Sequence, residues 1–186
     1  MACEASNTWP SDIRVSVNLS PVQFRDRNLA SKVVSILKRT GMDPRRLELE
    51  TTEAALLQDN EDNLSTLAEL RNTGARIVMD DFGTGYSSLN YLRSFPFDKI
   101  KIDRSYIKDL VKENVNSLTI VRAVLALAAG LSLSTTAEGV ETKEQLDILN
   151  QAGYDEIQGY YFSKPMPAPE IPALIDKITS NKMQAA

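Results

Sequence analysis

Short runs rich in β-branched and apolar residues alternate with longer helical runs along the chain, and this alternation limits the possible folds more than any other feature. It predicts strands at Arg14–Asn18, Arg46–Glu50, Arg76–Asp80, Lys99–Asp103, Leu131–Ala137 and Asp155–Ile157. It predicts helices at Asn28–Gly41, Asn60–Asn72, Tyr86–Leu92, Asn116–Ala129, Lys143–Ala152 and Pro169–Lys177. About six βα units in succession, without a run of hairpin turns, indicate a parallel sheet covered by helices.

A doubly wound sheet and a barrel both have this order of elements, and the polar residues at the strand ends help to choose between them. Carboxylates and an amide stand at the C-terminal ends of several predicted strands: Asn18, Glu50, Asp80 with Asp81, Asp103 and Glu138. In a barrel these ends converge on one face. In an open sheet, strands far from the switch point would not all meet at one site. The sequence therefore favours an α/β fold of the TIM-like barrel type.

The length and composition indicate one globular domain and exclude several kinds of chemistry. The chain has 186 residues, of which 42% are hydrophobic and 25% charged, and its net charge is -4. This acidic balance argues against a nucleic-acid partner. The sequence contains no histidine, which excludes Ser-His-Asp and Cys-His catalysis and histidine-based zinc sites. Any catalysis here must use carboxylates, amides, lysine and metal-bound water.

Three further features concern the location of the chain. No apolar run is long enough to span a bilayer, because Arg122 and Gly130 interrupt the longest one. The segment Met1–Asp12 does not have the pattern of a signal peptide. The single cysteine, Cys3, cannot form an intrachain disulfide and fits a reducing compartment. We therefore expect a cytoplasmic location.

The segment Asp80–Gly85, with the sequence Asp-Asp-Phe-Gly-Thr-Gly, is the most informative single motif. Two adjacent carboxylates at the end of an apolar strand repel each other, and a bound cation relieves that repulsion. Gly83 and Gly85 allow a sharp turn close to a ligand. A solvated acidic turn explains the segment equally well when it is considered alone.

The other candidate residues each have an ordinary structural explanation. Glu53 fits the first turn of a helix, and Asn18 could belong to a turn in which Ser20 caps a helix that starts at Pro21. Lys101 could be a solvated strand residue, although inside a barrel it would point, with Lys99, to the side away from Ile100. Glu138, Glu141 and Gln158 are each weak evidence when considered alone.

The motifs are much more specific when they are read together. Six motifs follow one another at the spacing of βα units. They are Asn-Leu-Ser-Pro at residue 18, Glu-Thr-Thr-Glu at 50, Asp-Asp-Phe-Gly-Thr-Gly at 80, Lys-Ile-Asp-Arg-Ser at 101, Ala-Glu-Gly-Val-Glu at 137 and Gln-Gly-Tyr at 158. This set resembles the EAL family of cyclic-di-GMP phosphodiesterases, from about Val15 to Pro167.

The resemblance implies a TIM-like barrel with a two-metal site, containing Mg²⁺ or Mn²⁺, that hydrolyses cyclic di-GMP to linear pGpG. It assigns Asn18, Glu50 and Asp80 to one metal, and Asp80, Asp81 and Glu138 to the second. It assigns Lys101 to orienting the attacking water, with Asp103 in support and with Glu138 in the catalytic group. It also gives supporting or substrate-binding roles to Gln158, Glu53, Glu141, Phe82, Gly83 and Ser87.

The sequence departs from the family pattern at its N-terminal side. The tripeptide Glu-Ala-Leu is absent: Glu4-Ala5 is followed by Ser6, and Glu53 is followed by Ala54 and Ala55. We therefore expect an incomplete barrel with about six of the eight βα units, in which residues 1–178 form a partial EAL domain and 179–186 a loose tail. The family glutamate that binds a metal is missing, so we expect weak hydrolysis or none.

Three functional hypotheses remain open at this point. The chain could be a metal-dependent phosphodiesterase domain, or a non-catalytic module that binds cyclic di-GMP or a protein partner. An unrelated α/β enzyme with accidental acidic strand ends is the third, and the ordered motifs argue strongly against it. The family resemblance also implies a homodimer and, in the parent protein, an upstream sensory or GGDEF domain.

Overall fold

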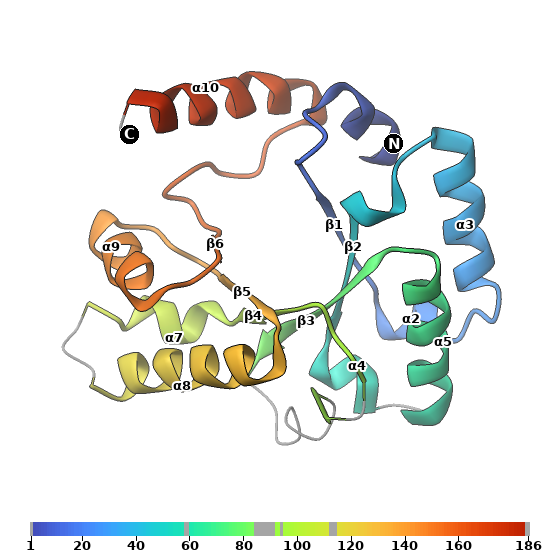
Figure 1. Ribbon diagram of the computed structural model, residues 1–186, viewed down its shortest axis with the longest axis horizontal. Helices are drawn as coiled ribbons and strands as arrows, with labels where there is room; N and C mark the ends of the chain where they lie inside the picture. Colours follow the sequence, from blue (N-terminus) through green and yellow to red (C-terminus); the bar gives the residue numbers. More distant parts are fainter. Residues whose placement is uncertain (1, 58–59, 84–91, 94, 112–114, 185–186) are drawn as a thin grey trace.

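The computed structural model describes residues 2–57, 60–83, 92–93, 95–111 and 115–184. Six parallel strands form one sheet in the order β1-β2-β3-β4-β5-β6. Their bounds are β1 Val15–Asn18, β2 Leu47–Thr52, β3 Arg76–Phe82, β4 Lys99–Ile102, β5 Ser134–Ala137 and β6 Glu156–Ile157. The sheet curls into an incomplete barrel with helices around it (Figure 1). The predicted α/β barrel type is confirmed.

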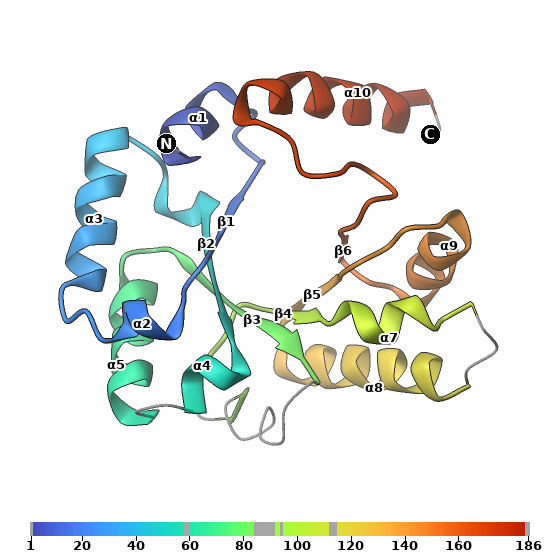
Figure 2. The same ribbon diagram turned by 180° about the vertical axis from the view of Figure 1, so that it is seen from behind.

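The longer helices also lie close to their predicted positions. They are α3 Leu29–Thr40, α5 Asn60–Asn72, α8 Val115–Leu131, α9 Lys143–Ala152 and α10 Ile171–Gln184. Shorter helical segments occupy the connections: α1 Ala2–Ala5, η1 Ser6–Thr8, α2 Pro21–Phe24, η2 Pro44–Arg46, α4 Glu53–Leu57, α7 Arg104–Lys108 and η3 Ala168–Glu170. Ser20 and Gln23 form a capping box at the start of α2, as the turn interpretation of that motif predicted. Helix α1 and the C-terminal helix α10 lie next to each other at one end of the molecule (Figure 2).

The C-terminal helix is longer than the sequence predicted. We expected no regular structure after residue 178, but α10 continues to Gln184. Lys, Met and Gln favour helices, and the segment contains neither glycine nor proline to end one. The helix expected at Tyr86–Leu92 lies almost wholly outside the described residues; Leu92 itself is helical.

Both faces of the central strands are buried, but the two faces differ in chemistry. Leu47 and Leu49 of β2 and Ile100 and Ile102 of β4 belong to the hydrophobic core. The alternate residues of the same strands are charged and also buried, among them Glu48, Glu50, Lys99 and Lys101. Because side chains alternate across a strand, the apolar set faces the surrounding helices and the charged set faces the inside of the barrel. Lys99 and Lys101 thus point to the side away from Ile100, as expected for a barrel, and pair there with Glu48 and Glu50.

A network of ion pairs fills the inside of the barrel toward the N-terminal ends of the strands. The Lys99 ammonium pairs with Glu48 at 2.8 Å and with Glu156, and Glu48 also accepts from Arg76 at 3.0 Å. Arg14, which precedes β1, pairs with Glu156 of β6 at 3.2 Å. Since β1 and β6 are the edges of the described sheet, this pair joins the edges across the interior. No helix in the described ranges is both long and apolar enough to cross a membrane.

Candidate metal site at the strand ends

Parallel pairing brings the predicted polar residues to the same end of the sheet. Asn18 is the register partner of Glu50, and Thr52 is the partner of Asp80. The next strands carry Lys101 beside Thr136 and end just before Asp103 and Glu138. The C-terminal strand ends therefore bring carboxylates and one lysine from several βα units to the same rim, as the barrel prediction requires.

An irregularity in β3 allows two neighbouring aspartates to serve the same site. Met79 of β3 pairs with Ile100 of β4, and Phe82 pairs with Ile102. Three steps along β3 therefore match two steps along β4, so β3 contains an extra residue. Asp81 has a φ of 54°, in the left-handed region that aspartate adopts more readily than most residues. In a regular strand, adjacent side chains point to opposite faces. The bulge removes that restriction for Asp80 and Asp81.

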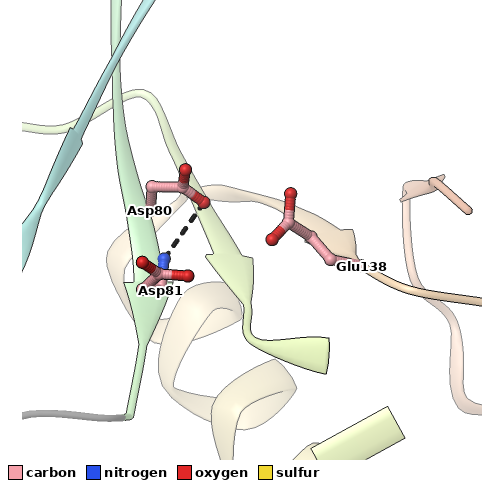
Figure 3. A group of neighbouring side chains, drawn as sticks. All are labelled: Asp80, Asp81 and Glu138. Atoms are coloured by element: carbon pink, nitrogen blue, oxygen red, sulfur yellow. Dashed lines mark hydrogen bonds between the residues drawn. The ribbon is translucent and has the colours of Figure 1, made fainter. Parts of the chain in front are cut away.

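The carboxylates of Asp80, Asp81 and Glu138 form a cluster that can hold a divalent cation. Each contributes a ligand oxygen, and these oxygens all lie within 4.8 Å of one another. Figure 3 shows Glu138 facing Asp80, with Asp81 directly beside Asp80. Carboxylate oxygens are hard donors, which suit Mg²⁺ and Mn²⁺. The residues present therefore fit such a metal.

Lys101 lies among the carboxylates of this site. Its ammonium nitrogen is 2.8 Å from Glu50 Oε2, 2.6 Å from Glu138 Oε1 and 3.1 Å from Asp80 Oδ1. The lysine side chain is only 5% exposed. A buried ammonium of this kind needs such partners, because an unpaired charge in the interior is very unfavourable. Lys101 thus neutralises part of the acidic charge at the rim.

The electrostatic environment shifts the pKa values of three groups. Burial raises the pKa of Glu138. The hydrogen bond and the charge of Lys101 oppose this rise, and the negative charges of Asp80 and Glu50 add to it. Burial also raises the pKa of Asp81, and the charges of Asp80 and Asp103 add to the shift. Burial on its own would lower the pKa of Lys101, but its hydrogen bonds to Glu138 and Glu50 outweigh that effect and raise it. Lys101 is therefore a permanent cation in this site.

The remaining predicted residues that the structure describes lie at the C-terminal ends of strands or in the segments just after them. Glu53 is 2% exposed and begins α4, and Asp103 caps α7 by accepting a hydrogen bond from Ser105 N at 3.0 Å. Asn18, Glu141 and Gln158 have exposed side chains. The Gln158 backbone binds Ala137 O at 2.8 Å and Val140 N at 3.1 Å, on either side of Glu138. Phe82 is buried and Gly83 follows it in the turn; Ser87 lies outside the described residues.

The structure also identifies two neighbours of the site that the sequence did not suggest. Tyr106 donates a hydrogen bond to Gly83 O at 2.6 Å. Gln145 is buried and accepts from the backbone N–H groups of Glu141 and Thr142, at 2.8 and 3.1 Å. The Gln145 contact had a sequence signal, since Thr142 and Gln145 have the spacing of a capping box. The Tyr106 contact had none, because it joins residues far apart in the sequence.

Comparison with known proteins agrees with this geometry. The family model described as EAL domain matches residues 1–165. The protein y4lL of Sinorhizobium fredii is 53% identical over 174 residues, which are 94% of this chain and 21% of that protein. MucR of Pseudomonas aeruginosa, a bifunctional diguanylate cyclase/cyclic di-GMP phosphodiesterase, is 38% identical over 178 residues, which are 94% of this chain and 26% of MucR.

Solved structures show the same likeness. The MucR phosphodiesterase in complex with c-di-GMP superposes with a TM-score of 0.85 at 38% identity, covering 91% of this chain and 70% of that one. BlrP1 of Klebsiella pneumoniae, solved with manganese and cyclic di-GMP, gives a TM-score of 0.80 at 30% identity, covering 88% of this chain and 42% of that one. The chain spans about a quarter or less of the curated relatives named above. The carboxylates of Glu50, Asp80, Asp81 and Glu138 form an acidic rim at the strand ends of the half-barrel. Together with this rim, these matches show that the chain belongs to the EAL domain family.

Proposed function

We propose that the acidic rim binds divalent cations, Mg²⁺ or Mn²⁺, together with cyclic di-GMP, and that hydrolysis of cyclic di-GMP to linear pGpG is the reaction to which the site is suited. The observation that carries this proposal is the cluster of Asp80, Asp81 and Glu138 beside the buried Lys101. It is further supported by the EAL structures that contain c-di-GMP and manganese.

The side chains of the rim would have different roles in binding the cations and in hydrolysis. Asp80, Asp81 and Glu138 would hold one cation, and Asn18, Glu50 and Asp80 a second. Bound divalent ions would supply positive charge for the phosphodiester and activate the attacking water. Lys101 would orient that water and offset charge that develops at phosphorus, because its ammonium is held within 3.1 Å of all three carboxylate partners. Asp103, Glu53, Glu141, Gln158 and the Phe82–Gly83 turn would support these groups.

We further propose that turnover by this chain is weak. The sequence contains no Glu-Ala-Leu tripeptide, so one carboxylate expected at a metal is missing. Loss of a group that stabilises the transition state costs about tenfold in rate for each 1.4 kcal/mol. A non-catalytic cyclic-di-GMP-binding module is the alternative, and it is favoured by the same missing carboxylate.

The proposal extends to partners and location. MucR is described as both a diguanylate cyclase and a phosphodiesterase, so this domain would work in a longer protein with a GGDEF or sensory domain. The edges β1 and β6 of the described sheet leave backbone groups that a second copy could cover, and we propose a homodimer. A cytoplasmic location is proposed because the single Cys3 needs no oxidising compartment.

The test uses the purified chain with Mn²⁺ and cyclic di-GMP. Calorimetry should detect Mn²⁺ binding and Mn²⁺-dependent binding of cyclic di-GMP, and chromatography should detect slow formation of pGpG. Asp80→Asn should weaken both binding steps, whereas Glu170→Gln, at an exposed carboxylate in η3, should not. Absence of Mn²⁺ and cyclic-di-GMP binding would contradict the proposed function.

The rate of pGpG formation separates the two candidate functions. Binding without any product supports the non-catalytic module. Turnover near about one per second, within the ordinary range of enzymes, would contradict the expectation of weak hydrolysis.

A further inference from the structure

The turn that follows Asp81 is held by a residue from another βα unit. Tyr106, in the short helix α7, donates its hydroxyl hydrogen to Gly83 O at 2.6 Å. The two residues are separated by 23 positions. Tyr106 is half-buried, and a neutral hydrogen bond in such a place makes a modest net contribution to stability.

The Tyr106 ring also occupies the space above Gly83. A Cβ added to Gly83 would lie 3.1 Å from Tyr106 Cε2 and 3.2 Å from its hydroxyl oxygen. Gly83 has a φ of 97°, which disfavours any other residue for a second reason. The tyrosine and the glycine therefore form a close contact in which the ring restricts the turn and the hydroxyl binds its carbonyl.

This contact lies two residues beyond the strained position of the metal site. Asp81 has a left-handed backbone, which is unfavourable for a non-glycine residue and persists only where the surrounding structure holds it in place. The backbone on the N-terminal side of Asp81 is held by the pairing of β3 with β2 up to Asp80, and that on the C-terminal side by the pairing of Phe82 with Ile102 of β4. The Tyr106–Gly83 bond holds the next residue, where the strand has ended.

The same helix contacts the loop that carries the third carboxylate. Gly139, directly after Glu138, has a φ of 72°, and a Cβ there would lie 2.5 Å from Arg104 Cβ. Arg104 and Tyr106 belong to one short helix that Asp103 caps. Helix α7 thus contacts the turn after Asp81 through Tyr106 and the turn after Glu138 through Arg104, so it can set the spacing between these two carboxylates.

We infer that Tyr106 is a positioning residue of the metal site: its hydroxyl group fixes Gly83 and thereby keeps the Asp81 carboxylate beside Asp80 and Glu138. The expected effect on Mn²⁺ affinity rests on the proposed metal-binding function. The expected effect on the backbone of the turn rests on the geometry of the turn alone. Tyr106 itself need not contact metal or substrate, since it acts through the backbone of the turn.

The variant Tyr106→Phe removes the hydroxyl and keeps the ring against Gly83. Its matched control is Tyr154→Phe, because the buried Tyr154 also donates its hydroxyl hydrogen to a backbone carbonyl, Val121 O at 3.3 Å, but lies outside the rim. Both variants should lose comparable stability. Only Tyr106→Phe should weaken Mn²⁺ binding, by about three- to tenfold, as expected for loss of one neutral hydrogen bond that positions a ligand.

Hydrogen–deuterium exchange of the metal-free protein provides the second readout. Tyr106→Phe should speed exchange in the peptide that covers residues 76–83 by a similar factor, and Tyr154→Phe should not. Unchanged exchange in that peptide, or Mn²⁺ affinity equal to that of the unaltered chain, would overturn the positioning role. If the unaltered chain binds no Mn²⁺, the proposed function fails, while the exchange result still decides the inference about the turn.

Discussion

Lys101 Nζ lies 2.8 Å from Glu50 Oε2, although β4 and β2 are not neighbours in the sheet and β3 lies between them. The pair therefore spans the inside of the curled sheet above β3, whose Asp80 is 3.1 Å from the same ammonium. This arrangement makes one lysine the common partner of carboxylates from three parts of the barrel.

The first prediction concerns the charge of Lys101. The variant Lys101→Met keeps most of the side-chain volume but leaves Glu50, Asp80 and Glu138 without their shared cation. We expect the metal-free protein to lose about 3–5 kcal/mol in free energy of unfolding, as when one partner of a buried ion pair is removed. Urea denaturation measures this, and Mn²⁺ should restore part of the loss by binding the released carboxylates.

The control for this variant is Lys143→Met. Lys143 forms an exposed pair with Asp147 at 2.9 Å, four residues along α9, and such pairs contribute about 0.3–0.5 kcal/mol. Equal losses in the two variants would contradict the role assigned to Lys101.

The second prediction concerns the ion pairs inside the barrel near the N-terminal ends of the strands. Glu48→Gln leaves the 3%-exposed Lys99 side chain with Glu156 as its remaining ion-pair partner among the described residues, and it also weakens the contact to Arg76. We expect a loss of about 3–5 kcal/mol in free energy of unfolding. Because the residues belong to one network, the double variant Glu48→Gln/Lys99→Met should lose clearly less than the sum of the single losses. Additive losses in urea denaturation would show that the two side chains are not coupled.

The third prediction concerns the pH dependence of Mn²⁺ binding. The pKa values of Glu138 and Asp81 are raised by burial, so protons remain on these carboxylates to a higher pH than usual. Mn²⁺ must displace those protons, and its apparent affinity should fall with decreasing pH, starting above the ordinary glutamate value of 4.5. Calorimetry in buffers of different ionisation enthalpy should detect proton release on binding. An affinity independent of pH, without proton release, would contradict the expected protonation.

The fourth prediction compares two glycines. A Cβ at Gly159 would lie 2.0 Å from Val140 O and 2.3 Å from Val140 N, both backbone atoms that cannot move aside easily. Gly159→Ala should therefore cost at least about 1–3 kcal/mol and should disturb the Val140–Gln158 hydrogen bond near Glu138.

Gly130 is the control for that change. It lies within α8, and an added Cβ meets no atom within 4 Å. Gly130→Ala should raise the free energy of unfolding by about 0.5–1 kcal/mol, because alanine restricts the unfolded chain and favours the helix. Thermal or urea denaturation of the two variants should shift in opposite directions.

Much of the fold and the site could be predicted from the sequence, because the patterns that indicate them are local. The periodicities of β2 and α5 are visible within ten or so residues, and polar residues at strand ends stand directly after apolar runs. Once the strands are parallel neighbours, Asn18, Glu50 and Asp80 must reach the same rim. The continuation of α10 to Gln184 escaped prediction, because polar helix formers without an apolar stripe show no periodicity.

The sequence by itself determined the order of the βα units, the family and the identity of the acidic residues at the rim. The tertiary structure alone decided how those residues meet: the bulge that turns Asp80 and Asp81 to one site, the position of Lys101 between three carboxylates, and the contact of Tyr106 with Gly83. It also decided that Arg14 and Glu156, 142 positions apart, join the two edges of the sheet. Such contacts depend on strand register and sheet curvature, which arise only when the whole chain is packed.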